Sequence, residues 1–107
     1  MQTITHRELK NMNGQEKKDF VLINVLPREY FKKQHIRTSI NIPVDSDNFT
    51  DQVEGVAGDK QRDIVVYCAD FECDASTKAA EKLENAGFTH IFDYEGGIKD
   101  WYNQKNA

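Results

Sequence analysis

The 107-residue sequence has few of the features that mark secreted, membrane-spanning or nucleic-acid-binding proteins. It contains only two cysteines, and no apolar run approaches the ~18 residues that a membrane-spanning helix needs. The first ten residues include no apolar stretch typical of a signal peptide. The net charge of −4 is mildly acidic, and no basic segment overrides it. We therefore expect a cytoplasmic protein with neither a membrane nor a nucleic-acid partner.

The sequence also lacks internal repeats, low-complexity segments and linkers. A chain of this length forms one domain, residues 1–107, and buries roughly two-thirds of the surface of its unfolded state. It therefore needs neither a disulfide nor a metal ion to fold. In a reducing compartment, a pair of cysteines is more often catalytic, redox-active or metal-binding than structural.

Short apolar runs alternate with helical patterns along the chain. Two continuous runs rich in β-branched residues, 20–25 and 63–68, are typical of strands that are buried on both faces. Shorter strands are expected at 3–5, 39–43 and 90–94. Helices are expected from the capping box of Thr5 and Glu8 to about 14, at 27–34, around 49–56, at 75–87 and at 98–104. Strands separated by helices predict an α/β fold, with a mostly parallel central sheet flanked by helices on both faces.

Both cysteines lie in one acidic segment, "YCADFECDAS", residues 67–76. Cys68 ends a predicted central strand, and the segment leads into the helix that starts near Ala75. Functional sites of parallel sheets lie beyond the carboxyl ends of the strands, and helix N-termini favour anions. We therefore expect the Cys68 thiol to lose its proton more easily than an ordinary thiol and to act as a nucleophile. The alternative is a buried cysteine that packs as a small apolar residue.

The whole chain resembles a single-domain rhodanese. The matching stretches are "VLINVLPREYFKKQHIRTSINIP", "DIVVYC" and "STKAAEKLENAGFTHIFDYEGGIKDW", in this order and spacing. The resemblance implies a rhodanese-like fold, and it implies that Cys68 accepts a sulfane sulfur and carries it as a persulfide. It also implies that backbone amides of the following loop cradle that sulfur. The active-site loop is assigned to Ala69, Asp70, Phe71, Glu72, Cys73 and Asp74.

The sequence departs from the family pattern in three places. Where the family commonly has Asp-Val-Arg after its buried strand, this chain has Asn24, Val25 and Leu26. Cys73 occupies the end of the loop, where the family often has arginine. The loop itself is acidic. These departures bear on the substrate more than on the fold.

The three acids of the segment are Asp70, Glu72 and Asp74. Together they can offset the stabilisation of a thiolate by a helix N-terminus, which is typically about 0.3–1 kcal/mol. They also repel a dianionic donor, so we expect weak activity with thiosulfate. Asp74 is expected to cap the following helix, and Asp70 and Glu72 are expected to be solvated loop charges.

Cys73 has three interpretations that the sequence leaves open. It can be a packed side chain, a metal ligand, or a resolving thiol that attacks an oxidised or persulfidated Cys68. The spacing of the two cysteines, with no histidine nearby in sequence, does not fit a zinc site, so we expect no metal. A loop this short can bring the two sulfurs together if the Cα atoms approach to within ~7 Å.

The sequence therefore predicts a rhodanese-like sulfurtransferase that requires no cofactor and whose partners are a sulfur donor and a thiol acceptor. The alternative is a non-catalytic rhodanese-fold module for binding or regulation. A phosphatase fits poorly, because the loop lacks the cationic clamp that phosphoryl transfer needs. His35 is expected to form a structural hydrogen bond. The basic residues Arg28, Lys32, Lys33 and Arg37 are expected to be solvated or to meet an acidic partner.

Overall fold

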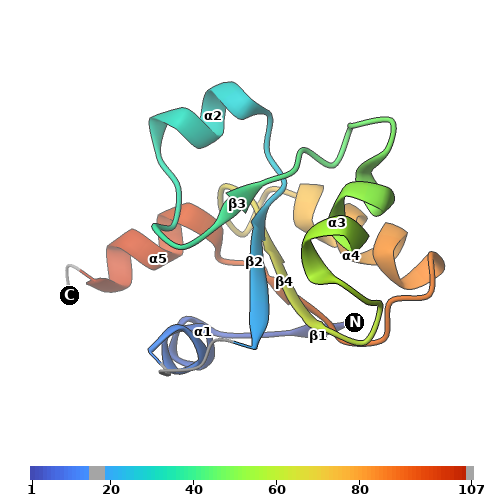
Figure 1. Cartoon of the computed structure of the whole chain (residues 1–107). Helices are drawn as coiled ribbons and strands as arrows, with labels where there is room; N and C mark the ends of the chain where they lie inside the picture. Colours follow the sequence, from blue (N-terminus) through green and yellow to red (C-terminus); the bar gives the residue numbers. More distant parts are fainter. Residues whose placement is uncertain (15–18, 106–107) are drawn as a thin grey trace.

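The computed structural model describes residues 1–14 and 19–105, which contain one five-stranded sheet and five helices (Figure 1). The strands are β1 (Gln2–Thr3), β2 (Phe20–Asn24), β3 (Ile40–Asn41), β4 (Asp63–Tyr67) and β5 (Ile91–Tyr94). The helices are α1 (His6–Asn13), α2 (Arg28–Lys33), α3 (Phe49–Ala57), α4 (Ala75–Asn85) and α5 (Gly97–Lys105). The strand order is β1-β5-β4-β2-β3, and every pair is parallel. The predicted α/β fold is confirmed.

Two apolar cores lie on opposite faces of the sheet. Ile23 of β2 and Val66 of β4 pack in the core beneath α3 and α4, whereas Leu22 and Val65 pack in the core beneath α1 and α5. Figure 1 shows α3 and α4 on one side of β2 and β4, and α1 and α5 on the other. Successive residues of a strand point to opposite faces. This is why β2 and β4 are continuous apolar runs rather than alternating ones.

Local sequence signals begin and end the helices largely as expected. Thr5 Oγ1 accepts from the backbone N–H of Glu8 at 3.2 Å, and the Glu8 carboxylate accepts from the Thr5 N–H, so the predicted capping box is confirmed. Gly87, at φ +98°, follows α4 and stops it. On α3, Ala57 is buried while Val56 is 45% exposed. None of the described helices is long and apolar enough to cross a membrane.

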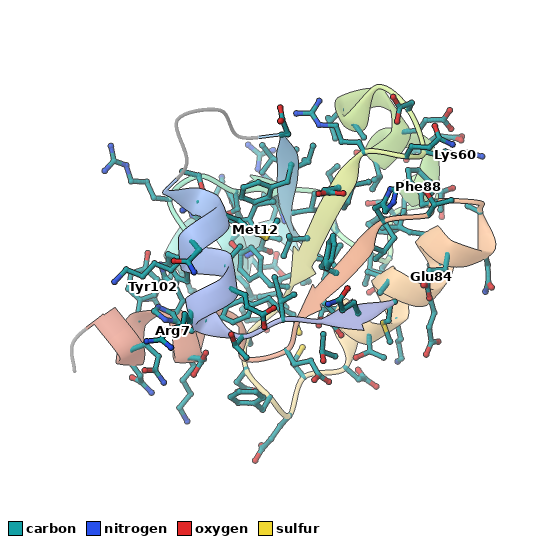
Figure 2. All side chains as sticks on the ribbon, turned by 90° about the horizontal axis from the view of Figure 1, so that it is seen from below. Arg7, Met12, Lys60, Glu84, Phe88 and Tyr102 are labelled. Atoms are coloured by element: carbon teal, nitrogen blue, oxygen red, sulfur yellow. The ribbon has the colours of Figure 1, made fainter. Side chains whose placement is uncertain are left out.

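The amino ends and the carboxyl ends of the strands have different surroundings. Before β4, the ammonium of Lys60 lies 5.8 Å from the ring centroid of Phe88 and donates to the Ala86 carbonyl. Figure 2 shows this pair at the end of the molecule opposite Tyr102. Tyr102 belongs to α5, whose first turn contacts the residues that follow β4 at the carboxyl ends of the strands.

A buried hydrogen-bond network anchors the segment after α2 to the end of β4. The Tyr67 hydroxyl accepts from the Ile36 N–H at 3.0 Å and lies 2.6 Å from Ser39 Oγ. Ser39 Oγ in turn donates to the Ile36 carbonyl. Burial raises the pKa of the Tyr67 phenol, so the hydroxyl stays protonated and donates to Ser39. The network fixes the last residue before Cys68.

Replacing Tyr67 with phenylalanine removes this hydroxyl and leaves the buried N–H of Ile36 without its acceptor. We expect the Tyr67→Phe protein to lose about 1–3 kcal/mol of unfolding free energy. Urea denaturation measures this loss. Tyr30→Phe, at an exposed position, is the matched control and should leave the midpoint unchanged. Equal midpoints for Tyr67→Phe and the wild type would show that the network does not stabilise the fold.

Candidate functional site

Cys68 lies immediately beyond β4, at the carboxyl edge of the sheet, rather than as the last strand residue. Its carbonyl oxygen accepts from the Ile98 N–H at 3.0 Å, and that of Ala69 accepts from the Lys99 N–H at 2.9 Å. Gly97, at φ +64°, makes this approach possible, because a Cβ there would overlap the Cys68 carbonyl oxygen. The first turn of α5 therefore fixes the base of the loop.

The sulfur of Cys68 is fully buried. Sγ lies 3.5 Å from the carbonyl oxygen of Cys73 and 3.6 Å from Ser76 Oγ. Burial raises the pKa of the Cys68 thiol to about 11, and the neighbouring Cys73 side chain adds to the rise. The hydroxyl and backbone N–H of Ser76, in the first turn of α4, act in the opposite direction. The expectation of an easily ionised Cys68 is thus wrong for this conformation, because burial outweighs the helix N-terminus.

The carboxylate of Asp70 binds the amides of its own loop. Its Oδ1 accepts from the backbone N–H of Glu72 at 3.0 Å and of Cys73 at 3.1 Å. These two amides therefore hold a carboxylate instead of cradling the sulfur, which differs from the arrangement that the family resemblance implies. Asp70 is half-exposed, so its carboxylate remains in contact with solvent while it also accepts from two loop amides. Asp70 thus supplies an internal anion to two of the amides that the family resemblance assigns to the sulfur.

Three residues of the loop, Phe71, Glu72 and Asp74, are exposed. Phe71 is 71% exposed, and Glu72 beside it is also exposed. Asp74 occupies the residue before α4 but forms no side-chain capping bond, so the predicted cap is wrong. Its carboxylate instead lies 3.4 Å from Lys78 Nζ, where both side chains are largely exposed. Such a pair contributes little to stability, typically about 0–1 kcal/mol.

An uncharged network replaces the charged pair that the family commonly has after its buried strand. Asn24 is buried, and its Oδ1 accepts from the Leu26 N–H at 2.9 Å. Asn41 Nδ2 donates to the Leu26 carbonyl at 2.8 Å.

His35 Nδ1 donates to the Phe31 carbonyl at 2.7 Å, so the structural hydrogen bond expected of His35 is confirmed.

The structure brings together residues that the sequence analysis did not single out. Ser76 contacts the sulfur, and its only sequence signal is a small hydroxyl residue in the first turn after the loop. Gly97 fixes the loop base, and its signal is the glycine pair that follows β5. Cys73, for which the sequence left a packed, metal-binding or resolving role open, is half-buried and packs against the same core as Cys68.

Removing the Asp70 carboxylate should open the loop. The carboxylate contributes two hydrogen bonds, so losing them favours the open loop by on the order of tenfold. In Asp70→Ala we expect Cys68 to be alkylated about that much faster at pH 7. Because the thiolate reacts, the wild-type rate should climb with pH toward about 11, and the Asp70→Ala profile should lie at lower pH.

Peptide mapping of the alkylated protein separates the two cysteines. Asp70→Asn keeps an acceptor oxygen and removes only the charge. Asp74→Asn removes the charge of a carboxylate that does not bind the loop amides. Both should react more slowly than Asp70→Ala. Equal rates in all three variants would mean that charge alone, and not the loop bonds, controls Cys68.

Residues 5–104 match the family model described as a rhodanese-like domain. The chain is 36% identical over 91 residues to the adenylyltransferase and sulfurtransferase UBA4 of Candida albicans, a match that covers 81% of the chain but only 20% of that protein. The Alr3790 protein from Anabaena sp. superposes with a TM-score of 0.83 at 25% identity, covering 94% of this chain and 75% of that one. A rhodanese from E. coli gives a TM-score of 0.65 at 30% identity, covering 76% and 89%. The chain belongs to the rhodanese-like domain family.

Proposed function

We propose that the protein is a sulfurtransferase in which Cys68 carries sulfane sulfur as a persulfide. The observation that supports this most directly is the position of the thiol. It lies at the carboxyl end of the central strand β4, within reach of the Ser76 hydroxyl and N–H, both of which favour a thiolate. Membership of the rhodanese-like domain family supports it too, as does the similarity to the adenylyltransferase and sulfurtransferase UBA4 of Candida albicans.

The transfer has two balanced steps. The Cys68 thiolate attacks the sulfane sulfur of a donor, the donor S–S bond breaks, and the donor leaves as a thiolate. An acceptor thiolate then attacks the outer sulfur of the Cys68 persulfide and regenerates the Cys68 thiolate. Neither an external oxidant nor a cofactor takes part. The closed loop must open first, since the sulfur is buried and protonated at neutral pH in the conformation described above.

Loading of Cys68 is tested by intact mass after the reduced protein is incubated with thiosulfate or with an organic persulfide. We expect the organic persulfide to add one sulfur atom to Cys68 and thiosulfate to add much less, because Glu72 and Asp74 are exposed carboxylates of the loop. Cys68→Ser should abolish the adduct, and Cys73→Ser should retain it. Loading that maps to Cys73, or no loading from any donor, would contradict the proposal.

A non-catalytic binding module is the second candidate. The observation that favours it is the closed site, in which the sulfur is buried and two loop amides are occupied by Asp70. The loading experiment decides between the two candidates. A module of this kind would stay unloaded even in Asp70→Ala, whose loop amides have lost their carboxylate acceptor.

Thiol redox chemistry through Cys73 is a finer part of the proposal. The carbonyl oxygen of Cys73 lies 3.5 Å from Cys68 Sγ, and the Cys73 side chain is close enough to raise the pKa of the Cys68 thiol. Stoichiometric hydrogen peroxide would then oxidise the two thiols to one disulfide and release water.

We expect this reaction to yield a monomer lighter by two hydrogen atoms, which a dithiol reverts. Cys73→Ser should abolish that product and lengthen the lifetime of the Cys68 persulfide, because no resolving thiol remains. Mass spectrometry of the non-reduced protein follows both quantities. If neither changes in Cys73→Ser, Cys73 is a packing residue.

A further inference from the structure

A cavity of about 420 Å³ lies between α2 and α5, beside the base of the reactive loop. Its volume falls within the ~300–1,000 Å³ that is usual for small-molecule sites. Leu26 and Ile98 contribute apolar side chains to its lining, and Tyr30 and Tyr102 contribute aromatic rings. Ala69, the neighbour of Cys68, also lines it. Cys68 itself is not a lining residue, and its sulfur packs in the core beneath α3 and α4, so the cavity reaches the reactive position through Ala69.

The walls of the cavity are held by contacts that do not involve a ligand. The Tyr102 hydroxyl donates to the His35 carbonyl at 2.7 Å, which joins α5 to the end of α2. The backbone N–H of Lys99 donates to the Ala69 carbonyl, which joins α5 to the loop. Lys33 Nζ lies 5.7 Å from the ring centroid of Tyr30, a cation–π contact on the α2 wall. The cavity is therefore largely formed before a ligand arrives.

The charges of the cavity are predominantly positive. Lys33 and Lys99 both line it, and in the described part of the chain neither forms an ion pair. Among the described lining residues, Asp70 alone has a carboxylate, and one of its oxygens already binds loop amides. Beyond the loop the sign reverses, since a second hollow of about 240 Å³ is lined by Asp70, Glu72 and Asp100 together with Lys99.

This separation of charge discriminates between two kinds of anionic substrate. A compact dianion carries its charge at the transferred sulfur and must bring it close to the acidic loop. A longer thiol can place its carboxylates on the two lysines while its sulfur, several bonds away, approaches Cys68. Each exposed ion pair of this kind improves binding by about threefold on average, and at best by about fivefold. The distance between charge and sulfur then decides which substrate is preferred.

We propose that the cavity between α2 and α5 binds the carboxylate-bearing end of a peptide-sized thiol, and that Lys33 and Lys99 select substrates whose negative charge is remote from the transferred sulfur. This inference rests on the proposed sulfur transfer and names the class of thiol that takes part in it. The tyrosine rings and the apolar side chains of the lining contact the uncharged body of that thiol.

Two synthetic thiols test the selection as acceptors for persulfidated protein. One is N-acetyl-Cys-Gly-Glu with free carboxylates, and the other is the uncharged N-acetyl-Cys-Gly-Gln amide. We expect the charged peptide to have the lower KM, with kcat nearly equal for the two. Lys33→Gln and Lys99→Gln should each raise the KM of the charged peptide by about threefold and leave that of the amide unchanged.

Lys32→Gln is the matched control, because Lys32 lies on the same helix but does not line the cavity. Its KM values should equal those of the wild type. If wild-type protein gives the same KM for both peptides, or if Lys32→Gln acts like Lys33→Gln, the cavity does not select charge and the proposal is overturned.

A binding measurement keeps this inference separate from sulfur transfer itself. The unreactive analogue N-acetyl-Ser-Gly-Glu is titrated into wild-type protein, and backbone amide shifts are followed by NMR. We expect saturable shifts at Tyr30, Lys33, Lys99 and Tyr102, which are lost in the Lys33→Gln, Lys99→Gln double variant. Loading of Cys68 without such shifts overturns only the proposal that the cavity binds the thiol. Shifts without any loading of Cys68 overturn the sulfur-transfer proposal.

Discussion

Two hydrogen bonds from the start of α5 to the carbonyl groups of Cys68 and Ala69 determine where the reactive loop lies. They form only because Gly97 has no side chain to collide with the Cys68 carbonyl. α5 is held in turn by the burial of Trp101 against the sheet and by the bond from Tyr102 to the end of α2. The position of Cys68 thus depends on β4, α5 and α2, which are far apart in sequence, and not on its own loop alone.

Within the loop, the Asp70 carboxylate occupies two of the donors that the family resemblance assigns to the sulfur. A thiolate at Cys68 would be stabilised by loop amides and by the first turn of α4, yet two of those amides already bind the Asp70 carboxylate. What remains is a helix-end effect of about 0.3–1 kcal/mol, and burial of the sulfur outweighs it. The pKa of about 11 expresses that balance. In this conformation the thiol is therefore protonated at neutral pH, and the proposed sulfur transfer would need a conformation in which the sulfur is exposed.

Signals that act over a few residues were readable from the sequence. The apolar runs predicted β2 and β4, and the Thr5 capping box predicted the start of α1. The order of strand, loop and helix predicted that Cys68 lies at the carboxyl ends of the strands. Interactions that depend on side-chain direction were not readable. Asp70 and Asp74 are alike in sequence, but Asp70 turns back onto the loop amides while Asp74 points outward to Lys78. The contact of Gly97 with Cys68 likewise depends on how β5 and α5 return to β4, which no local pattern specifies.

The base and the tip of the loop are held by different interactions, so they can respond independently. The carbonyl groups of Cys68 and Ala69 are bound to α5, whereas the Asp70 carboxylate binds only Glu72 and Cys73 within the loop itself. Breaking the bonds to that carboxylate therefore need not disturb the base of the loop or the α2–α5 cavity whose wall includes Ala69. In the proposed transfer, opening of the loop would expose the sulfur, and the proposed thiol would bind in the cavity next to Ala69. The free energy of opening the loop and the free energy of binding a ligand in the cavity should then be nearly additive, because the groups that determine them share few contacts.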